Sequence, residues 1–374
     1  MKFLQNEKDV LNCYSPKLAG KLQEQGLINL EREGSPGIAL FKEHGAVQLL
    51  IPKKFGGFGV SATEALKYQV ALGSLAPSLA IATTMHQYKV ATLVEMAKNR
   101  DLSALLDKIS SGNLLIASGG SEGNTDGNLF YPGVTASDTE DGLLVNGTKR
   151  PCCLTWSMDI LSVLLVTEEN SKYRGELVNV IVDASDPTIK REKFWNNRIL
   201  AASESDAVTL NNTRVSDDNV FAVGTPQNAK AFATSAFLWF ETLATGSYLG
   251  MAGRLIEILM EENKIPRQDI AALDILFDSQ LAALEYVALR IDNGDSLSEK
   301  LLARLLRIRY ATQDAIATIS SQSMEYLGGL RFATSEESTL LANSCRALMF
   351  HPPARKVMNN NLLHYRETGS LSLA

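Results

Sequence analysis

Hydrophobic residues recur every three to four positions through the first 112 residues, with small residues between them. That spacing gathers hydrophobic side chains on one face of successive helices, so the pattern predicts a helical domain over residues 1–112. Within it, Ser61 precedes Glu64 by three residues, which is the spacing of a capping box that satisfies free N–H groups at a helix start. We therefore expect a helix to begin at Ala62.

The pattern changes over residues 113–222, where β-branched residues alternate with polar ones between Gly, Asn and Asp positions. The runs ILSVLLVT and LVNVIVDAS are typical of strands, and several strands at short intervals predict a small antiparallel barrel or sandwich. Asp141-Gly142 supplies the positive φ angles of a tight turn, so it predicts a hairpin between VTAS and LLVNG. These residues form the predicted β-domain.

The helical period returns over residues 223–374 and predicts a C-terminal bundle of four long helices, with Gly328 and Gly329 acting as a connector. The helices are expected to open near Lys230, Ile270, Leu297 and Ser335. Two pairs in this region have the capping-box spacing, Ser296 with Glu299 and Thr334 with Glu337. The predicted fold class is therefore α+β and mainly α.

Charge and composition narrow the function. The 374-residue chain has a formal net charge of −6, so it has no overall positive field to attract nucleic acid or an anionic membrane surface. No apolar run approaches the ~20 residues of a membrane span, and the start lacks the apolar core of a signal peptide. Four cysteines without a C-x-x-C spacing indicate reduced thiols in a cytoplasmic protein. No His/Cys spacing predicts a metal site.

Four segments, taken in order, resemble the acyl-CoA dehydrogenase superfamily over nearly the whole chain. They are IPKKFGGFGVSATEA, ASGGSEGNTDGN, LLVNGTKRPCCLTWSMD and SMEYLGGLRF. The resemblance implies an N-terminal helical domain, a middle antiparallel β-barrel domain and a C-terminal four-helix bundle. It also implies a flavin cofactor, FAD or possibly FMN in its place, and a homodimer or homotetramer. Small residues on the first bundle helix would allow close contact between copies: Gly246, Gly250, Ala252 and Gly253.

The resemblance also implies which residues contact the flavin. Ser121 stands where the family commonly has a residue of its first β-strand that meets the flavin ring. Cys153, Leu154 and Thr155 match a flavin-contacting stretch that usually reads Trp-x-Thr, and Cys153 takes the place of the threonine. Glu325 stands where Gln is usual in the Gln-x-x-Gly-Gly segment that ends in Gly328 and Gly329.

Two family motifs are missing. After the first bundle helix the chain has MEENKIPRQDIAALD in place of Arg-x-x-Phe-Gly, and Pro352 stands where many dehydrogenases carry a glutamate base. Removal of an α-proton from an acyl thioester needs such a base. Glu241 is the first candidate to replace it, because it is the only charged residue within SAFLWFETLATGSYLGMAG. The family position for a base on this helix matches Phe240, one residue away.

Two histidines support a different chemistry. His86 lies in a helical segment of the first domain and His351 in the stretch MFHPPARK. Flavin monooxygenases of the same fold resemble the chain at both places. An imidazole there could donate a proton during oxygen chemistry. A buried structural role is the alternative for each histidine.

The leading hypothesis is a flavin-dependent oxidoreductase that desaturates an acyl thioester carried on CoA or a carrier protein, with an electron-transfer partner or oxygen as acceptor. One alternative is a flavin-dependent monooxygenase of the same fold. Another is a non-catalytic homologue that binds or assembles other proteins. No nucleic acid partner and no membrane span are expected.

Overall fold

The computed structural model describes residues 2–123, 132–262 and 265–373. Its first part is helical, as the spacing of hydrophobic residues predicts. The helices are α1 (Gln5–Tyr14), α2 (Leu18–Gln25), α3 (Leu27–Leu30), α4 (Gly37–His44), α5 (Ala62–Leu75), α6 (Pro77–Met96) and α7 (Ser103–Gly112). The capping box at the start of α5 is confirmed, since Ser61 accepts a hydrogen bond from the Glu64 N–H and the Glu64 side chain accepts one from the Ser61 N–H.

The strands form two four-stranded sheets rather than a closed barrel within the described residues. One sheet has the order β1 (Ile116–Gly119), β4 (Ile160–Val166), β5 (Leu177–Asp183), β8 (Val220–Gly224). The other has the order β2 (Thr135–Asp138), β3 (Gly142–Cys152), β7 (Asp206–Ser216), β6 (Ile189–Glu192). Pairing is antiparallel except between β1 and β4, which are parallel. Parallel strands need a crossover connection, and here it includes β2 and β3 of the other sheet.

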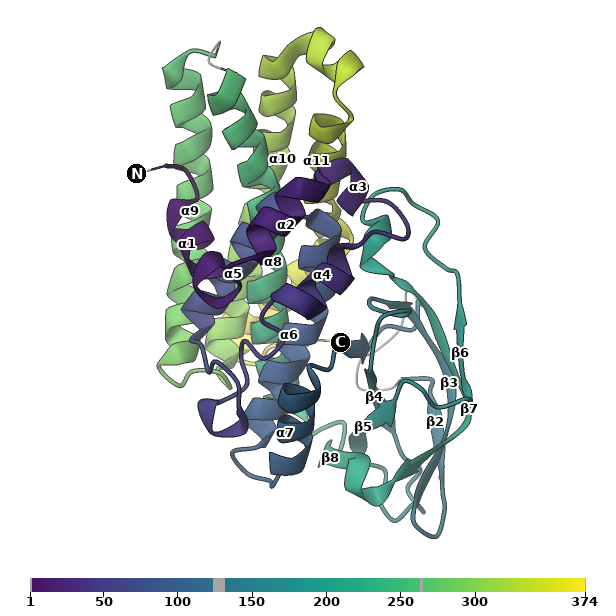
Figure 1. Ribbon diagram of the computed structural model, residues 1–374. Coiled ribbons are helices and arrows are strands. Elements are labelled where there is room, and N and C mark those ends of the chain that lie inside the picture. Colours follow the sequence, from purple (N-terminus) through teal and green to yellow (C-terminus); the bar gives the residue numbers. More distant parts are fainter. Residues whose placement is uncertain (1, 124–131, 263–264, 374) are drawn as a thin grey trace.

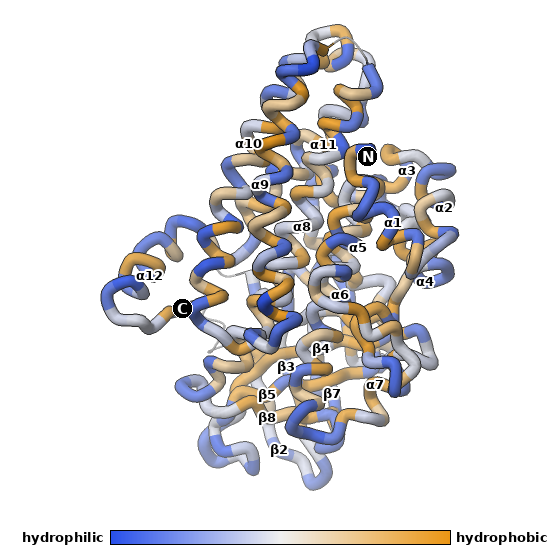
Figure 2. Tube along the Cα trace, turned by 90° about the vertical axis from the view of Figure 1, so that its left-hand side faces the viewer, coloured by the Kyte–Doolittle hydropathy of each residue, from blue (hydrophilic) through white to orange (hydrophobic). Residues whose placement is uncertain are grey.

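The β2–β3 hairpin is confirmed, and its register places Asp138 opposite Leu143. Strand β4 is almost wholly buried and β5 is buried except at Asp183, so both read as continuous hydrophobic runs rather than alternating ones. Figure 2 shows these strands as a largely hydrophobic layer beneath the helices. In Figure 1 the two sheets lie beside α6 and α7, at the lower right of the molecule.

The C-terminal part contains α8 (Lys230–Glu262), α9 (Arg267–Asp292), α10 (Glu299–Thr334), α11 (Glu336–Arg346) and α12 (Arg355–Thr368). The first four open close to the predicted positions, and α12 was not predicted because its sequence is mostly polar. In Figure 2, α12 and the C-terminus project away from the other helices.

Both capping boxes predicted in this part are wrong. Ser298, not Ser296, caps α10 by accepting a hydrogen bond from the Leu301 N–H. Ser335 is the N-cap of α11 and makes no side-chain cap hydrogen bond. The predicted connector is a kink inside α10, where Gly328 has φ 75°. Glycine tolerates this left-handed conformation, so the helical pattern resumes directly after it.

Helix α8 runs through the centre of the bundle, which explains why its sequence is hydrophobic on all sides. It packs against α5 and α6 on one side and against α9, α10 and α11 on the other. A side chain at Gly250 would lie 2.0 Å from the Val70 carbonyl oxygen of α5, and one at Gly73 would lie 2.1 Å from the Ser247 oxygen.

These close approaches correct the prediction made from the small residues of α8. Gly246, Gly250, Ala252 and Gly253 are all buried within the chain. Gly246 and Gly250 face side chains or backbone of α5, and Gly253 faces Phe277 of α9. The small residues therefore serve contacts inside one chain and do not argue for contacts between copies. None of the described helices combines the length and apolar character needed to cross a membrane.

We expect Gly250→Ala to destabilise the fold, because its methyl group would collide with the backbone of α5 rather than with a movable side chain. Such overpacking costs about 1–3 kcal/mol, which urea unfolding would measure as a lower midpoint. Gly20→Ala in α2 is the matched control, since nothing lies within 4 Å of the added carbon. That control should keep or slightly raise stability. Equal midpoints for the two variants would contradict the close α5–α8 contact.

Candidate functional site

A run of ring and hydroxyl contacts joins α6, α8, β1 and the segment after α11. The Tyr88 hydroxyl hydrogen-bonds the Ser118 hydroxyl of β1, and the Tyr88 ring meets the Phe240 ring edge-on with centroids 5.3 Å apart. Phe240 stacks against His351 at a centroid distance of 6.1 Å, and His351 Nε2 lies 2.7 Å from the Tyr248 hydroxyl. We call these five residues the His351 cluster.

His351 and Tyr248 are both neutral at pH 7. Burial and the nearby charge of Arg309 lower the pKa of His351 to about 4. Burial raises the pKa of Tyr248 well above its ordinary value. A neutral imidazole donates through one nitrogen and accepts through the other. If Nε2 accepts a hydrogen bond from Tyr248, Nδ1 carries the proton and is a donor. If Nε2 donates, Nδ1 is an acceptor.

Glu241 follows Phe240 in the sequence but faces another direction, because one residue turns a helical side chain by about 100°. Its carboxylate is fully buried, with Oε2 lying 2.7 Å from Nε of Arg309, itself fully buried. Burial raises the pKa of Glu241 to about 7, and the Arg309 charge opposes that rise. Neither carboxylate oxygen has a hydrogen-bond partner among the described residues. The contact is thus a close ion pair without an aligned hydrogen bond.

Arg309 links this ion pair to the segment that carries His351. Its Nη2 donates to the carbonyl oxygens of Leu348 at 3.1 Å and of His351 at 2.6 Å. Its Nη1 donates to the Pro353 carbonyl oxygen at 3.3 Å. The guanidinium therefore holds three main-chain carbonyls across the turn that presents the His351 ring.

His86 lies outside the cluster and has both ring nitrogens engaged by main chain. The Ile116 N–H donates to Nδ1 at 3.0 Å, so the proton sits on Nε2, which donates to the Val47 carbonyl oxygen at 2.8 Å. The ring is fully buried, and burial lowers its pKa to about 4. The residue joins α6 to β1 and to the loop before α5, which fits the structural alternative.

The predicted flavin-contacting residues Cys153, Leu154 and Thr155 lie in a tight turn directly after β3. Leu154 has φ 64° and a fully buried side chain. The Thr155 hydroxyl is also fully buried and donates to the Cys152 carbonyl oxygen at 2.6 Å. Cys153 is half-buried, and its Sγ lies 3.0 Å from the Ser205 hydroxyl. Of these side chains, Cys153 packs against the same hydrophobic cluster as Tyr88 and Phe240.

Ser121 lies just beyond the end of β1 and is half-buried. Its hydroxyl accepts a 3.4 Å hydrogen bond from the Gly123 N–H, and its carbonyl accepts one from the Arg150 N–H at 2.9 Å. The neighbouring Glu122 pairs with the buried Lys149 of β3 at 2.6 Å. Ser121 is thus anchored near the sheet edge that faces α6.

A buried cation that the sequence did not single out lies beside the cluster. Lys89 of α6 is only 8% exposed, and its Nζ lies 5.5 Å from the Tyr88 ring centroid. Burial and the charge of Lys149 lower its pKa to about 8. Within the part of the chain that the structure describes, Lys89 has no carboxylate in ion-pair or hydrogen-bond contact. The described residues therefore place a buried positive charge in the site with no carboxylate beside it.

Glu325, Gly328 and Gly329 lie near the end of α10, and Glu325 and Gly329 are exposed. The α10–α11 turn stands at the top of Figure 1, away from the two sheets. A single chain therefore does not bring these residues to the predicted flavin-contacting turn that follows β3. Of the predicted site residues, Cys153 therefore packs near the His351 cluster, whereas the three residues at the end of α10 lie away from it.

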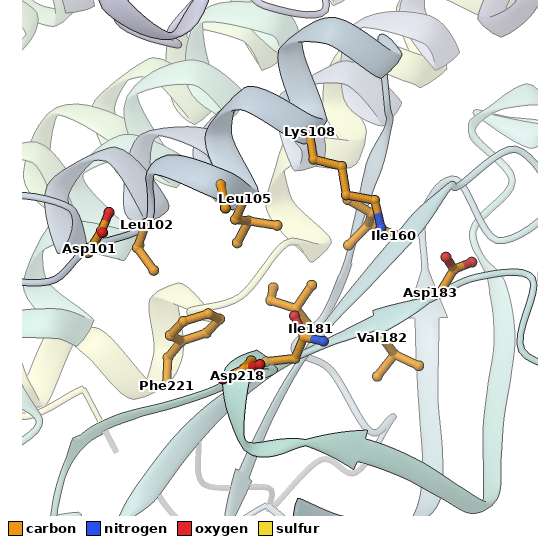
Figure 3. A pocket seen from close by; sticks show the side chains of 12 residues that line it. Asp101, Leu102, Leu105, Lys108, Ile160, Ile181, Val182, Asp183, Asp218 and Phe221 are labelled. Carbon is orange, nitrogen blue, oxygen red and sulfur yellow. The ribbon is translucent and has the colours of Figure 1, made fainter.

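A separate pocket opens between α7 and the sheet of β4, β5 and β8 (Figure 3). Leu105 and Lys108 line it from α7, and Ile181 and Phe221 line it from the sheet. None of the predicted site residues lines it, and its hydrophobic floor is formed by side chains of the sheet. The His351 cluster is the candidate site instead, because ionisable and hydroxyl side chains converge there.

Comparison with known proteins finds relatives and structures that are named as hydroxylases, monooxygenases or FMN-binding proteins. No protein-family model matches the chain. Isobutylamine N-hydroxylase of Streptomyces viridifaciens is 34% identical over 381 residues, which cover 100% of both chains. Dibenzothiophene monooxygenase of Rhodococcus qingshengii is 23% identical over 62% of this chain and 58% of its own length. The FMN-bound TdsC of Paenibacillus sp. A11-2 has the same fold, with TM-score 0.81, 16% identity and coverage of 100% and 99%.

Acid should destabilise the protein, because the fully buried His86 and the half-buried His351 resist protonation in the folded state. An unfolded histidine gains a proton near pH 6.5, but His86 and His351 do so only near pH 4 when folded. Stability is therefore complete above pH 6.5 and falls as the pH drops toward 4, by at most about 3 kcal/mol per residue. Urea unfolding of His86→Asn should show a shallower loss between pH 7 and 5.

The exposed His364 provides the control for this measurement. His364→Asn should keep the wild-type dependence of unfolding free energy on pH. If His86→Asn also kept it, the neutral buried state of His86 would be wrong.

Proposed function

Because the chain belongs to the acyl-CoA dehydrogenase superfamily of flavoproteins, we propose that it is a flavin-dependent monooxygenase and, more narrowly, an N-hydroxylase of small primary amines. The full-length relative acts, by its name, on isobutylamine. A flavin-dependent monooxygenase is the alternative that His86 and His351 favoured in the sequence. The acyl desaturation that headed the hypotheses is less well supported, because a relative that matches the whole chain is named as a hydroxylase.

One observation of the site carries the proposal: among the described residues, no carboxylate belongs to the His351 cluster. Phe240 occupies the position of a base on α8, while Glu241 is turned away and paired with Arg309. Desaturation of an acyl thioester needs a carboxylate opposite the flavin. Oxygen insertion into an amine has no such requirement, so the neutral rings and hydroxyls of the cluster suit it better.

The side chains around the cluster fit a flavin. A flavin ring presents nitrogen and oxygen atoms along one edge, and the hydroxyls of Ser118 and Ser205, with the Cys153 thiol, supply matching groups near α6. The phosphate and the reduced ring are negative, and the buried ammonium of Lys89, which contacts no carboxylate among the described residues, fits such a charge. FMN and FAD share these features. We propose that these residues, with Ser121, hold the cofactor.

The net reaction is R–NH2 + O2 + 2e− + 2H+ → R–NHOH + H2O. A bound, reduced flavin supplies the two electrons. The protein's part is to bind the amine, exclude water and direct protons. Phe240 and Tyr88 offer aromatic surface for a short alkyl group, and an aromatic ring also attracts an ammonium. His351, held by Tyr248, is the group that donates or accepts a hydrogen bond at the reacting atoms.

We also propose a homo-oligomer. Ile275 and Leu289 of α9 are 70% and 53% exposed, and Leu330 and Phe332 of α10 are 81% and 63% exposed. Exposed large apolar side chains thus occur on two neighbouring helices, and surfaces that associate carry such side chains. A second copy would also bring the exposed end of α10, with Glu325, Gly328 and Gly329, to a β-domain that its own chain does not reach.

The function predicts hydroxylamine formation in a defined reaction. The reaction contains the protein, flavin, isobutylamine, oxygen and a flavin reductase with its reduced nicotinamide. It should yield one hydroxylamine for every two electrons supplied, measured by mass spectrometry. Removal of the protein or oxygen should abolish the product. Addition of acyl-CoA or acyl-carrier thioesters under anaerobic conditions should leave the oxidised flavin spectrum unchanged. Bleaching by a thioester would instead establish the dehydrogenase, and failure to bind any flavin would establish a non-catalytic homologue.

Lys89 provides a test of the cofactor site that does not depend on turnover. Lys89→Met keeps the length of the side chain and removes its charge, so flavin should bind about 10-fold more weakly, in titrations of flavin fluorescence. Lys98→Met is the control, because Lys98 is exposed and pairs with Glu95 beyond the site. The assignment of Lys89 fails if both variants bind FMN and FAD as the wild type does.

A further inference from the structure

The turn that carries His351 is held in place from inside the bundle. It follows the 3₁₀ turn Ala347–Phe350 and precedes α12, so no helical hydrogen bonds fix its carbonyls at His351 and Pro353. Both carbonyls are instead bound by α10. Arg309 donates to the carbonyls of Leu348, His351 and Pro353, and the Tyr310 hydroxyl donates to Pro353 at 2.9 Å.

A fully buried guanidinium is stable only with compensation for its charge. Glu241 supplies it from α8 across a 2.7 Å gap, and both side chains are at most 1% exposed. Carbonyl dipoles add to this compensation but carry no net charge. The position of the His351 turn is thus tied to an ion pair between two helices that are adjacent in space and distant in sequence.

We propose that Glu241 and Arg309 are positioning residues: their buried ion pair fixes the Leu348–Pro353 turn, so that the His351 ring stays between Phe240 and Tyr248. This inference rests on the proposed function, in which His351 meets the reacting atoms. It assigns Glu241 no proton transfer. Its carboxylate pairs with Arg309 of α10 and, among the described residues, forms no hydrogen bond or ion pair with Tyr88 or His351.

The geometry also explains why the cation is arginine. A guanidinium has N–H groups directed along three sides, so it can donate to three carbonyls through Nη1 and Nη2 while Nε faces a carboxylate. A lysine ammonium at the end of a flexible chain would keep the positive charge opposite Glu241. It would not span the same carbonyls. Charge balance and positioning of the turn can therefore be separated by substitution.

The experiment compares Arg309→Lys, Glu241→Gln and the paired apolar replacement Glu241→Leu with Arg309→Met. Arg307→Lys is the matched control, since Arg307 lies on the same helix and donates to Ala303 and Leu362 away from the turn. For each variant, hydrogen exchange of residues 347–354 is measured with flavin affinity, kcat, KM and the peroxide released per oxygen consumed. Oxygen reduced without amine hydroxylation appears as hydrogen peroxide.

All three test variants should exchange faster in the turn and release several-fold more peroxide, while flavin affinity changes little. Misplacement of a contact group by about 1 Å can cost about 10²-fold in turnover, so kcat should fall far more than KM rises. Arg307→Lys should match the wild type in every readout. The paired replacement removes both charges and so remains informative if a buried unpaired charge prevents either single variant from folding.

Two results would overturn the proposal. If Arg309→Lys keeps the turn protected and turnover normal while Glu241→Gln abolishes turnover, Glu241 takes part in the chemistry. If the paired replacement keeps slow exchange in residues 347–354, the ion pair does not hold the turn. Hydrogen exchange needs no substrate. A failure of amine hydroxylation in the wild type would therefore refute the proposed function, while the test of whether the ion pair holds the turn would still be valid.

Discussion

The close approach of α8 to α5 determines where every other part of the site lies. Glycines on both helices let the backbone of one approach the backbone of the other, at Gly73 against Ser247 and at Gly250 against Val70. These two contacts set which face of α8 lies against α5. One face presents Phe240 to α6, and another, about 100° away, presents Glu241 to α10. Phe240 and Glu241 are adjacent in the sequence, and their different surroundings follow from the roughly 100° between their side chains.

Much of the fold could be predicted from local sequence signals. The helical spacing of the first part, the Ser61–Glu64 capping box, the Asp141-Gly142 hairpin and the openings of the bundle helices depend on neighbours within a few residues. The two incorrect capping boxes show the limit of such signals, because several serines near a helix start compete and the tertiary path selects one. The parallel pairing of β1 with β4 joins distant segments, and no local pattern indicates it.

The candidate site was less predictable, since its residues meet only after folding. The sequence identified His351 and Glu241 but not their partners Tyr248 and Arg309, which lie on other turns or helices. Arg309 resembles a member of a solvated basic stretch, and only burial distinguishes it from Arg307. Lys89 carries no motif at all. His86 and Glu241 attracted attention as ionisable residues in apolar helices, and the structure shows that backbone groups and Arg309 account for their burial.

The contact between α5 and α8 also has a consequence for the order in which the protein can fold during synthesis. Helix α5 ends at Leu75 and α8 begins at Lys230, so the ribosome makes every strand that the structure describes between the two partners. Until α8 emerges, the hydrophobic faces of α5 and α6 have no bundle to cover them. Contacts of such long sequence separation form late and leave apolar surface open in the meantime. The nascent chain should therefore depend on chaperones through most of its elongation, and acquire its resistance to proteases only when the last third of the sequence has been translated.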